Sequence, residues 1–284
     1  MSMSNRTRQQ VVGLLSVGLA AVGIAVLVVL LVLGGTPHPW WLGGVFAAVF
    51  VVREFLSVEV AGRIRISSSS MVAFTAAVVF GREAAAPAVA LMAAMAMLQP
   101  DDVRSRRWQQ PLANLGQLIL SSTAGILVFS LFLPAGELTR GDLPMLTVGA
   151  LVGVVVYNYC NYQLVAGFVR LAYPDRRMPP WSSFLSTHAS IAALAVLGAL
   201  LGAAYLMVGP VIAPLILSTY PVGHVGFATN ARLREAHEST IRGFVKVVEA
   251  LDPYTKGHTE RMAHLCRIVG EEMGLPWERM ETMR

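Results

Sequence analysis

Charged residues are scarce in this sequence of 284 residues, and lysine is almost absent. Only 14% of the residues are charged, whereas soluble globular proteins contain about a quarter. Both lysines lie after residue 240, and the first 224 residues carry 13 arginines and eight acidic residues. Together with 55% hydrophobic residues and a mean hydropathy of +0.59, this scarcity excludes a disordered chain and an ordinary cytosolic enzyme. It indicates an integral membrane protein.

Cysteine is also rare. The two cysteines, Cys160 and Cys266, lie far apart, and no C-x-x-C pair occurs. This pattern provides neither a disulfide framework nor a cysteine zinc site. We interpret the two side chains as unrelated free thiols.

The charges divide the chain into two parts, with a boundary near residues 222–228. Residues 225–284 carry nine basic and nine acidic residues, so this part is neutral and water-soluble. The high pI of 9.6 therefore reflects arginines in membrane loops and not a nucleic-acid-binding patch. We expect no nucleic-acid partner.

The first part contains about eight apolar segments. A spanning helix needs about 20 apolar residues; the third, fourth and eighth segments are shorter and contain glycine or proline. The first is too long for the apolar region of a cleaved signal peptide, so we expect it to remain in the protein. The predicted segments are 11–33, 40–55, 67–80, 84–98, 112–133, 143–169, 184–207 and 211–225.

The arginines predict how these segments are oriented, because cytoplasmic loops of membrane proteins are enriched in Arg and Lys. With eight segments, eleven arginines fall at the N-terminus and in the even-numbered connections. Only Arg82 and Arg140 fall in the odd-numbered connections. We therefore expect about eight spans, with the N-terminus and the C-terminus both in the cytoplasm.

Polar side chains within the apolar segments are costly in a membrane, and they mark either function or packing. Two interpretations remain open: a ligand or sensory site inside the bundle, and hydrogen bonds between packed helices, each worth about 0.6–2 kcal/mol. The residues concerned are Asn114, Gln117, Asn158, Asn161 and His188.

Ionisable side chains are absent from the middle of the apolar segments. Arg53 and Glu54 fall at the end of the second segment, where we expect the arginine to reach the membrane surface along its aliphatic stem. A proton-coupled transporter normally has ionisable groups at mid-membrane. A transporter is therefore the weaker hypothesis.

Residues 229–251 predict a helix that leads from the last segment into the cytoplasm, with Thr229 or Asn230 capping its start. Its seam positions alternate at spacings of four and three, which is typical of a coiled coil. This pattern favours a homodimer formed through the connecting helix; the alternative is a short amphipathic helix packed on the next domain. The seam consists of Leu233, His237, Thr240, Phe244, Val247 and Leu251.

A motif follows this helix. Asp252 and Pro253 predict a turn, and Gly257 allows a close approach into the next helix. His258 then stands in the first turn of a helix that carries an apolar stripe. A histidine there is either a metal ligand or a hydrogen-bonded structural residue, and the residues alone do not decide between them.

The motif resembles the opening helix of the HD-GYP phosphohydrolase domain. Residues 250–263 read A-L-D-P-Y-T-K-G-H-T-E-R-M-A, and residues 271–275 read E-E-M-G-L. The resemblance implies a bacterial phosphodiesterase that hydrolyses cyclic di-GMP at a centre of divalent metal ions, often iron or manganese. The resemblance also implies that His258 is a metal ligand. It implies that Arg261 is a structural residue or lies near the phosphate of the substrate. The supporting positions of the motif are Asp252, Pro253, Tyr254, Gly257 and Arg261.

The resemblance ends before the catalytic centre is complete, because the sequence contains no His-Asp dipeptide and no Gly-Tyr-Pro. We therefore expect a domain that is truncated after its first helices and is inactive alone. Metal ions and cyclic di-GMP are expected only for a longer protein, and no cofactor is expected for this chain.

The expected fold class is all-α, a polytopic helical bundle of the bacterial inner membrane in contact with the lipid bilayer. Residues 1–225 form a sensor-like transmembrane domain, 226–251 a connecting signalling helix and 252–284 the N-terminal fragment of an HD-GYP domain. The first domain loosely resembles multi-span sensor modules that precede HD-GYP and GGDEF domains, in residues 66–70 and 114–117. The hypotheses are a membrane-bound receptor, a non-catalytic interaction or sensor protein, and a transporter.

Overall fold

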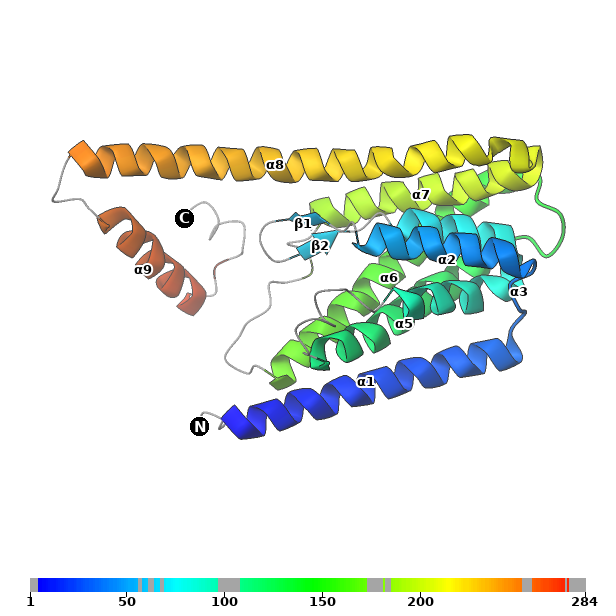
Figure 1. Ribbon diagram of the computed structural model, residues 1–284, viewed down its shortest axis with the longest axis horizontal. Coiled ribbons are helices and arrows are strands. Elements are labelled where there is room, and N and C mark those ends of the chain that lie inside the picture. Colours follow the sequence, from blue (N-terminus) through cyan, green and yellow to red (C-terminus); the bar gives the residue numbers. More distant parts are fainter. Residues whose placement is uncertain are drawn as a thin grey trace.

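The computed structural model is built almost entirely of helices, as predicted (Figure 1). It describes residues 5–55, 58–60, 64–66, 69–96, 108–172, 181, 185–251, 257–273 and 275. One small feature was not predicted, the antiparallel pairing of two three-residue strands in which Glu59 lies opposite Arg65. The elements are α1 (Asn5–Leu33), α2 (Trp40–Phe55), β1 (Val58–Val60), β2 (Ile64–Ile66), α3 (Ser69–Met95), α5 (Gln109–Ser130), η1 (Arg140–Asp142), α6 (Leu143–Ala172), α7 (Leu185–Val208), η3 (Pro210–Ile212), α8 (Ala213–Leu251) and α9 (His258–Glu272).

By total length and composition alone, five of the described helices could cross a bilayer, which agrees with a membrane protein. The predicted number of about eight is not reached. The second predicted segment is α2, a helix of 16 residues, and the eighth lies in η3 and the start of α8. The five candidate spans are Gln9–Leu33, Ser69–Met95, Gln109–Ser130, Arg140–Ala172 and His188–Val208.

The third and fourth predicted segments are the two halves of α3, which is folded at Gly81. Gly81 has φ 75° and ψ 177°, a conformation that glycine adopts without steric cost. Ala73 and Val89 line the same small cavity, although a straight helix would hold them about 24 Å apart. The two halves therefore turn back on each other as a helical hairpin. Neither half alone has the ~20 residues of a full span.

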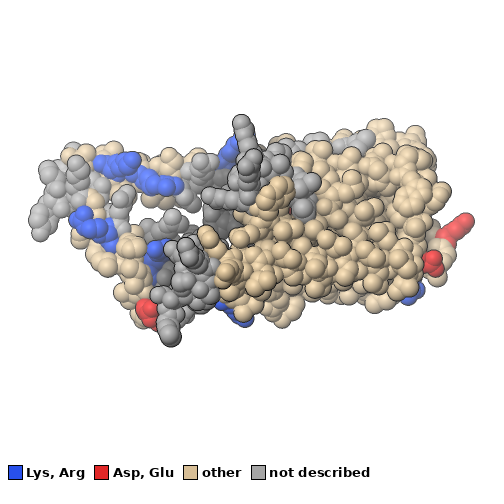
Figure 2. Space-filling view, turned by 60° about the horizontal axis from the view of Figure 1, so that its bottom comes forward, with Lys and Arg blue, Asp and Glu red and all other residues tan. Residues whose placement is uncertain are grey.

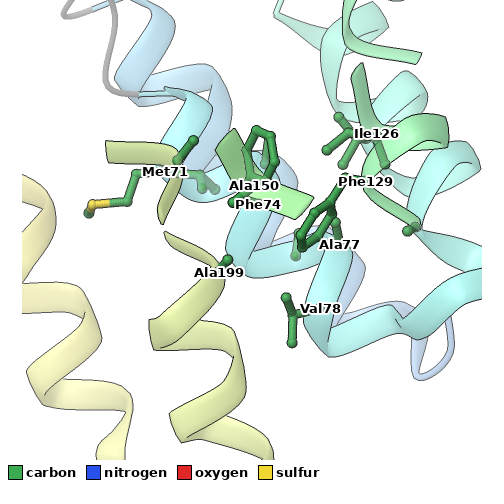
Figure 3. Close-up of a cluster of buried hydrophobic side chains, with 14 of the residues drawn as sticks. Met71, Phe74, Ala77, Val78, Ile126, Phe129, Ala150 and Ala199 are labelled. Atoms are coloured by element: carbon green, nitrogen blue, oxygen red, sulfur yellow. The ribbon is translucent and has the colours of Figure 1, made fainter. Parts of the chain in front are cut away.

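The α3 hairpin is the centre of the bundle, in contact with α1, α2, α5 and α7. Two thirds of its residues are buried. Phe74 packs edge-to-face on Phe129 of α5, with ring centroids 4.9 Å apart. Ala150 of α6 and Ala199 of α7 complete this cluster (Figure 3). Because lipid tails are as apolar as these side chains, the bundle is stabilised mainly by van der Waals packing.

Glycine brings α7 into direct backbone contact with α3. A β-carbon at Gly198 would collide with the carbonyl oxygen of Met71, and one at Gly202 would lie 2.8 Å from that of Thr75. The Thr75 hydroxyl lies 3.0 Å from the Gly198 carbonyl oxygen and 2.8 Å from that of Met71. Small residues four positions apart are a common basis for helix association in membranes.

Charged side chains lie at the ends of the bundle and not along its middle. Figure 2 shows a broad zone without Lys, Arg, Asp or Glu on the visible face, with charged residues beyond it at either end. This arrangement fits helices whose middle parts lie in a membrane.

α8 continues without a break from the bundle to Leu251, and it projects well beyond the other helices (Figure 1). The predicted start at Thr229 or Asn230 is wrong, because both residues lie inside this single helix. The predicted end at Leu251 is confirmed. After Gly257, α9 begins at His258 as predicted.

Candidate functional site

Two of the predicted polar residues meet between α5 and α6. The side-chain amide of Gln117 donates a hydrogen bond to the Asn161 carbonyl oxygen over 2.6 Å. Asn158, three residues before Asn161 on α6, is only 5% exposed. This part of the predicted polar site therefore joins two packed helices, which is what the packing interpretation requires.

The other two residues of the predicted polar site lie elsewhere. Asn114 is exposed on α5. The His188 ring on α7 stacks on Trp181, with centroids 4.6 Å apart and an interplanar angle of 24°. Trp181 in turn meets the edge of Tyr159 at 6.2 Å. His188 thus belongs to an aromatic cluster at the contact of α6 and α7, and the predicted residues do not form one site.

Hydroxyl groups within the spans are mostly satisfied by their own helices. Ser121 donates to the Gln117 carbonyl oxygen over 2.7 Å, and Ser122 donates to that of Leu118. Such bonds to the preceding turn allow serine to lie in a helix without an exposed donor. These serines therefore need no ligand to complete their hydrogen bonding.

A small cavity lies among α2, both halves of α3, α5 and α6. Its volume is about 20 Å³, which is enough for about one water molecule. The Ser70 hydroxyl lines it and is buried without a hydrogen-bond partner among the described residues. A single water could satisfy this hydroxyl, but no metabolite fits. The lining residues are Phe50, Ser69, Ser70, Ala73, Phe74, Val89, Leu118, Ser122, Gly125, Ile126 and Tyr157.

Arg53 contradicts the expectation that it would reach the membrane surface. It lies in the last turn of α2, as predicted, but only 6% of it is exposed. Phe50, one turn earlier on α2, lines the cavity together with Tyr157 of α6. The end of α2 therefore lies close to the cavity. The apolar context of Arg53 in V-V-R-E-F was the one sequence signal for this burial.

In the predicted phosphodiesterase motif, the structure places three of the residues at the start of α9. His258 is exposed and is the first residue of the helix. Gly257 precedes it with φ +69°, and a β-carbon there would lie 2.9 Å from a guanidinium nitrogen of Arg261. Glycine at 257 therefore makes room for the Arg261 side chain. Asp252, Pro253 and Tyr254 lie outside the described residues.

His258 has no partners for a metal site within the part of the chain that the structure describes. No group of three or more His, Cys, Asp or Glu side chains close enough to hold a metal ion occurs there. One exposed imidazole is too few ligands for a metal centre of the kind that activates water.

Comparisons with known proteins found no matching protein-family model, no matching curated protein and no matching solved structure.

Proposed function

We propose that this chain is a signalling receptor of the bacterial cytoplasmic membrane whose cytoplasmic end begins an HD-GYP phosphodiesterase domain. The observation that carries the proposal is the length and continuity of α8 (Figure 1). Its 39 residues extend over about 58 Å, roughly twice the apolar thickness of a bilayer. One helix therefore connects the apolar bundle with the segment that carries Gly257 and His258, and it provides a path for a signal.

In this proposal the apolar segments cross or re-enter the membrane eight times, and both termini lie in the cytoplasm. The distribution of arginines supports this orientation. The contact of the Gln109 side-chain amide with the Gln9 carbonyl oxygen at 3.5 Å also supports it, because α1 and α5 must then begin on the same side. At the other end of α1, the Gly35 amide donates to the Glu83 carbonyl oxygen over 3.3 Å. Glu83 follows the Gly81 turn, so this turn lies on the opposite side.

The proposed reaction is hydrolysis of cyclic di-GMP, with His258 as one ligand of an iron or manganese centre. Bound metal ions would polarise the phosphate and lower the pKa of a bound water. This chain would contribute His258 at the exposed start of α9, directly after the turn at Gly257. The remaining ligands would have to come from residues other than the described ones.

Membrane vesicles of defined sidedness test this proposal. We expect the protein, with any residues encoded after Arg284, to hydrolyse external cyclic di-GMP in inside-out vesicles and not in right-side-out vesicles. His258→Ala should lower the rate at least 100-fold, because a metal ligand is lost. His264→Ala is the matched control, because His264 is also exposed on α9, and its rate should stay within about twofold of the original.

Trypsin added to the same vesicles tests the orientation separately. The exposed Lys246 on α8 should be cleaved only in inside-out vesicles. Cleavage in right-side-out vesicles would reverse the proposed topology. Absence of hydrolysis, or equal rates for the two histidine variants, would refute the proposed phosphodiesterase activity. Neither result would contradict the proposed membrane topology.

A non-catalytic interaction protein is the second candidate, and α9 favours it. Its apolar stripe is exposed: Leu265 is 53% and Val269 55% accessible to solvent. Exposed apolar stripes of this kind mark binding surfaces. This candidate predicts no hydrolysis in either kind of vesicle, with the trypsin result unchanged.

A further inference from the structure

The cytoplasmic half of α8 has an apolar face that nothing in the described chain covers. Large side chains recur along it, and they are strongly exposed: Leu233 is 70%, Phe244 68% and Val247 57% accessible. We call this face the α8 seam; its described members are Leu233, His237, Thr240, Phe244 and Val247. Ile241 and Val248, which border it, are also half exposed. A continuous exposed apolar face of this size marks an interaction surface.

The spacing of the α8 seam specifies what kind of partner fits it. Spacings of four and three residues keep side chains on one line along a helix that winds around a second helix. Thr240 is compatible with such an interface, because its hydroxyl bonds to the Ala236 carbonyl oxygen of its own helix over 2.8 Å. The opposite face carries Ser239, Arg242 and Lys246, which suit water. The partner is therefore a helix that runs alongside α8.

The membrane restricts the direction of this partner helix. α8 is the continuation of a helix that starts beside the apolar bundle, so its seam begins at a fixed height above the membrane surface. A second copy in the same membrane presents an identical seam, at the same height and in the same direction. Two-fold symmetry then places each seam residue opposite its own counterpart. Any other partner would need its own membrane anchor and an apolar seam at the same height and in the same direction.

We infer that two copies of this chain form a parallel, in-register coiled coil through the α8 seam, with Phe244 facing Phe244 and Thr240 facing Thr240. This inference rests on the membrane anchorage in the proposed function but not on phosphodiesterase activity. His237 is the ionisable member of the seam, and the other polar member, Thr240, already bonds to its own helix. A polar residue at one core position fixes register at a cost in stability.

Cysteine cross-linking of the full chain in native membranes tests the inference. Cys160 and Cys266 are first replaced by serine, and single cysteines are then introduced by Thr240→Cys, Phe244→Cys or Lys246→Cys. Under mild oxidation we expect disulfide-linked dimers from the first two variants. The yield from Lys246→Cys, on the opposite face, should be at least about tenfold lower, since facing core positions lie close enough for a disulfide and opposite faces do not.

Each other outcome overturns the inference. Equal yields on both faces would indicate random collision, and absence of any dimer would show that the seam does not pair with itself. If a chain with both Phe244→Cys and Leu265→Cys instead forms a disulfide within one molecule, the seam is covered by α9. Trypsin cleavage in the vesicle experiment shows independently whether the anchorage is correct.

A second pair of variants tests the seam without disulfides. Val247→Glu should lower energy transfer between fluorescently labelled copies in liposomes at a fixed protein-to-lipid ratio, because like charges would face each other in the core. His237→Leu should raise it, because the polar position is removed. Lys246→Glu serves as the control for added negative charge. If Val247→Glu and Lys246→Glu have the same effect, the seam is not the interface.

Discussion

The bundle and the two last helices, α8 and α9, use apolar side chains in opposite ways. In α3 and the helices around it, apolar residues are buried against each other, and Met71, Phe129 and Leu146 are completely inaccessible. In α8 after residue 230 and in α9, most of the described large apolar side chains are exposed, and Leu233 and Phe244 are 70% and 68% accessible. The bundle is complete within one chain. α8 and α9 have the periodicity of packed helices, but the described chain leaves most of their large apolar side chains uncovered.

The largest expected effect concerns the close contact of α3 and α7. Gly198→Leu should destabilise the bundle by about 3 kcal/mol, because the side chain must displace the backbone at Met71. Unfolding of the purified protein in micelles with a rising fraction of SDS measures this change. Gly18→Leu is the control, because a β-carbon at Gly18 meets no atom within 4 Å. Equal effects of the two exchanges would show that α3 and α7 do not cross at this point.

A smaller effect is expected for the hydrogen bond between α5 and α6. A double-mutant cycle with Gln117→Leu and Asn161→Leu should give a coupling of about 0.6–2 kcal/mol, measured by the same unfolding assay. Asn114→Leu, an exposed position on α5, should show no coupling to Asn161→Leu. A coupling of zero for Gln117 would mean that the polar residues of α6 are not used in packing.

The smallest effect is expected in α9, where it sharpens the contrast between the two regions. Leu265→Gln should change the stability of the protein by less than about 0.5 kcal/mol, because the side chain is already exposed. The same exchange at the buried Leu146 should cost at least about 2 kcal/mol, because it buries an amide without partners. If both exchanges cost the same, α9 is packed in the folded chain and the contrast fails.

The positions of the helices followed from the apolar runs, because every backbone polar group in a membrane must be satisfied within its own helix. The second predicted segment, 40–55, coincides with α2, and the sixth differs from α6 only at its end. The predicted start of the connecting helix at Thr229 or Asn230 was wrong for a local reason. Residues that favour a helix cap cost only about 0.5 kcal/mol inside a helix, so continuous hydrogen bonding through α8 prevails.

The arrangement of the helices could not be predicted from the same patterns. The turn at Gly81 and the burial of Arg53 depend on which helices surround them. Whether Gln117 faces Asn161 depends on the rotation of two helices about their axes. His188 fits the pattern of an intramembrane polar residue, yet its neighbours Trp181 and Tyr159 are aromatic. Single-sequence patterns carry no information about these contacts between distant segments.

In the proposed receptor, the cavity beside Ser70 has a consequence for how a stimulus would act. Because it holds only about one water, a larger molecule can enter only by wedging the α3 hairpin away from α5 and α6. Binding of the molecule in the cavity and displacement of the α3 hairpin would then occur together. The strength with which an agonist binds would be reduced by the work of separating the helices, and a weak agonist would be one that separates them less.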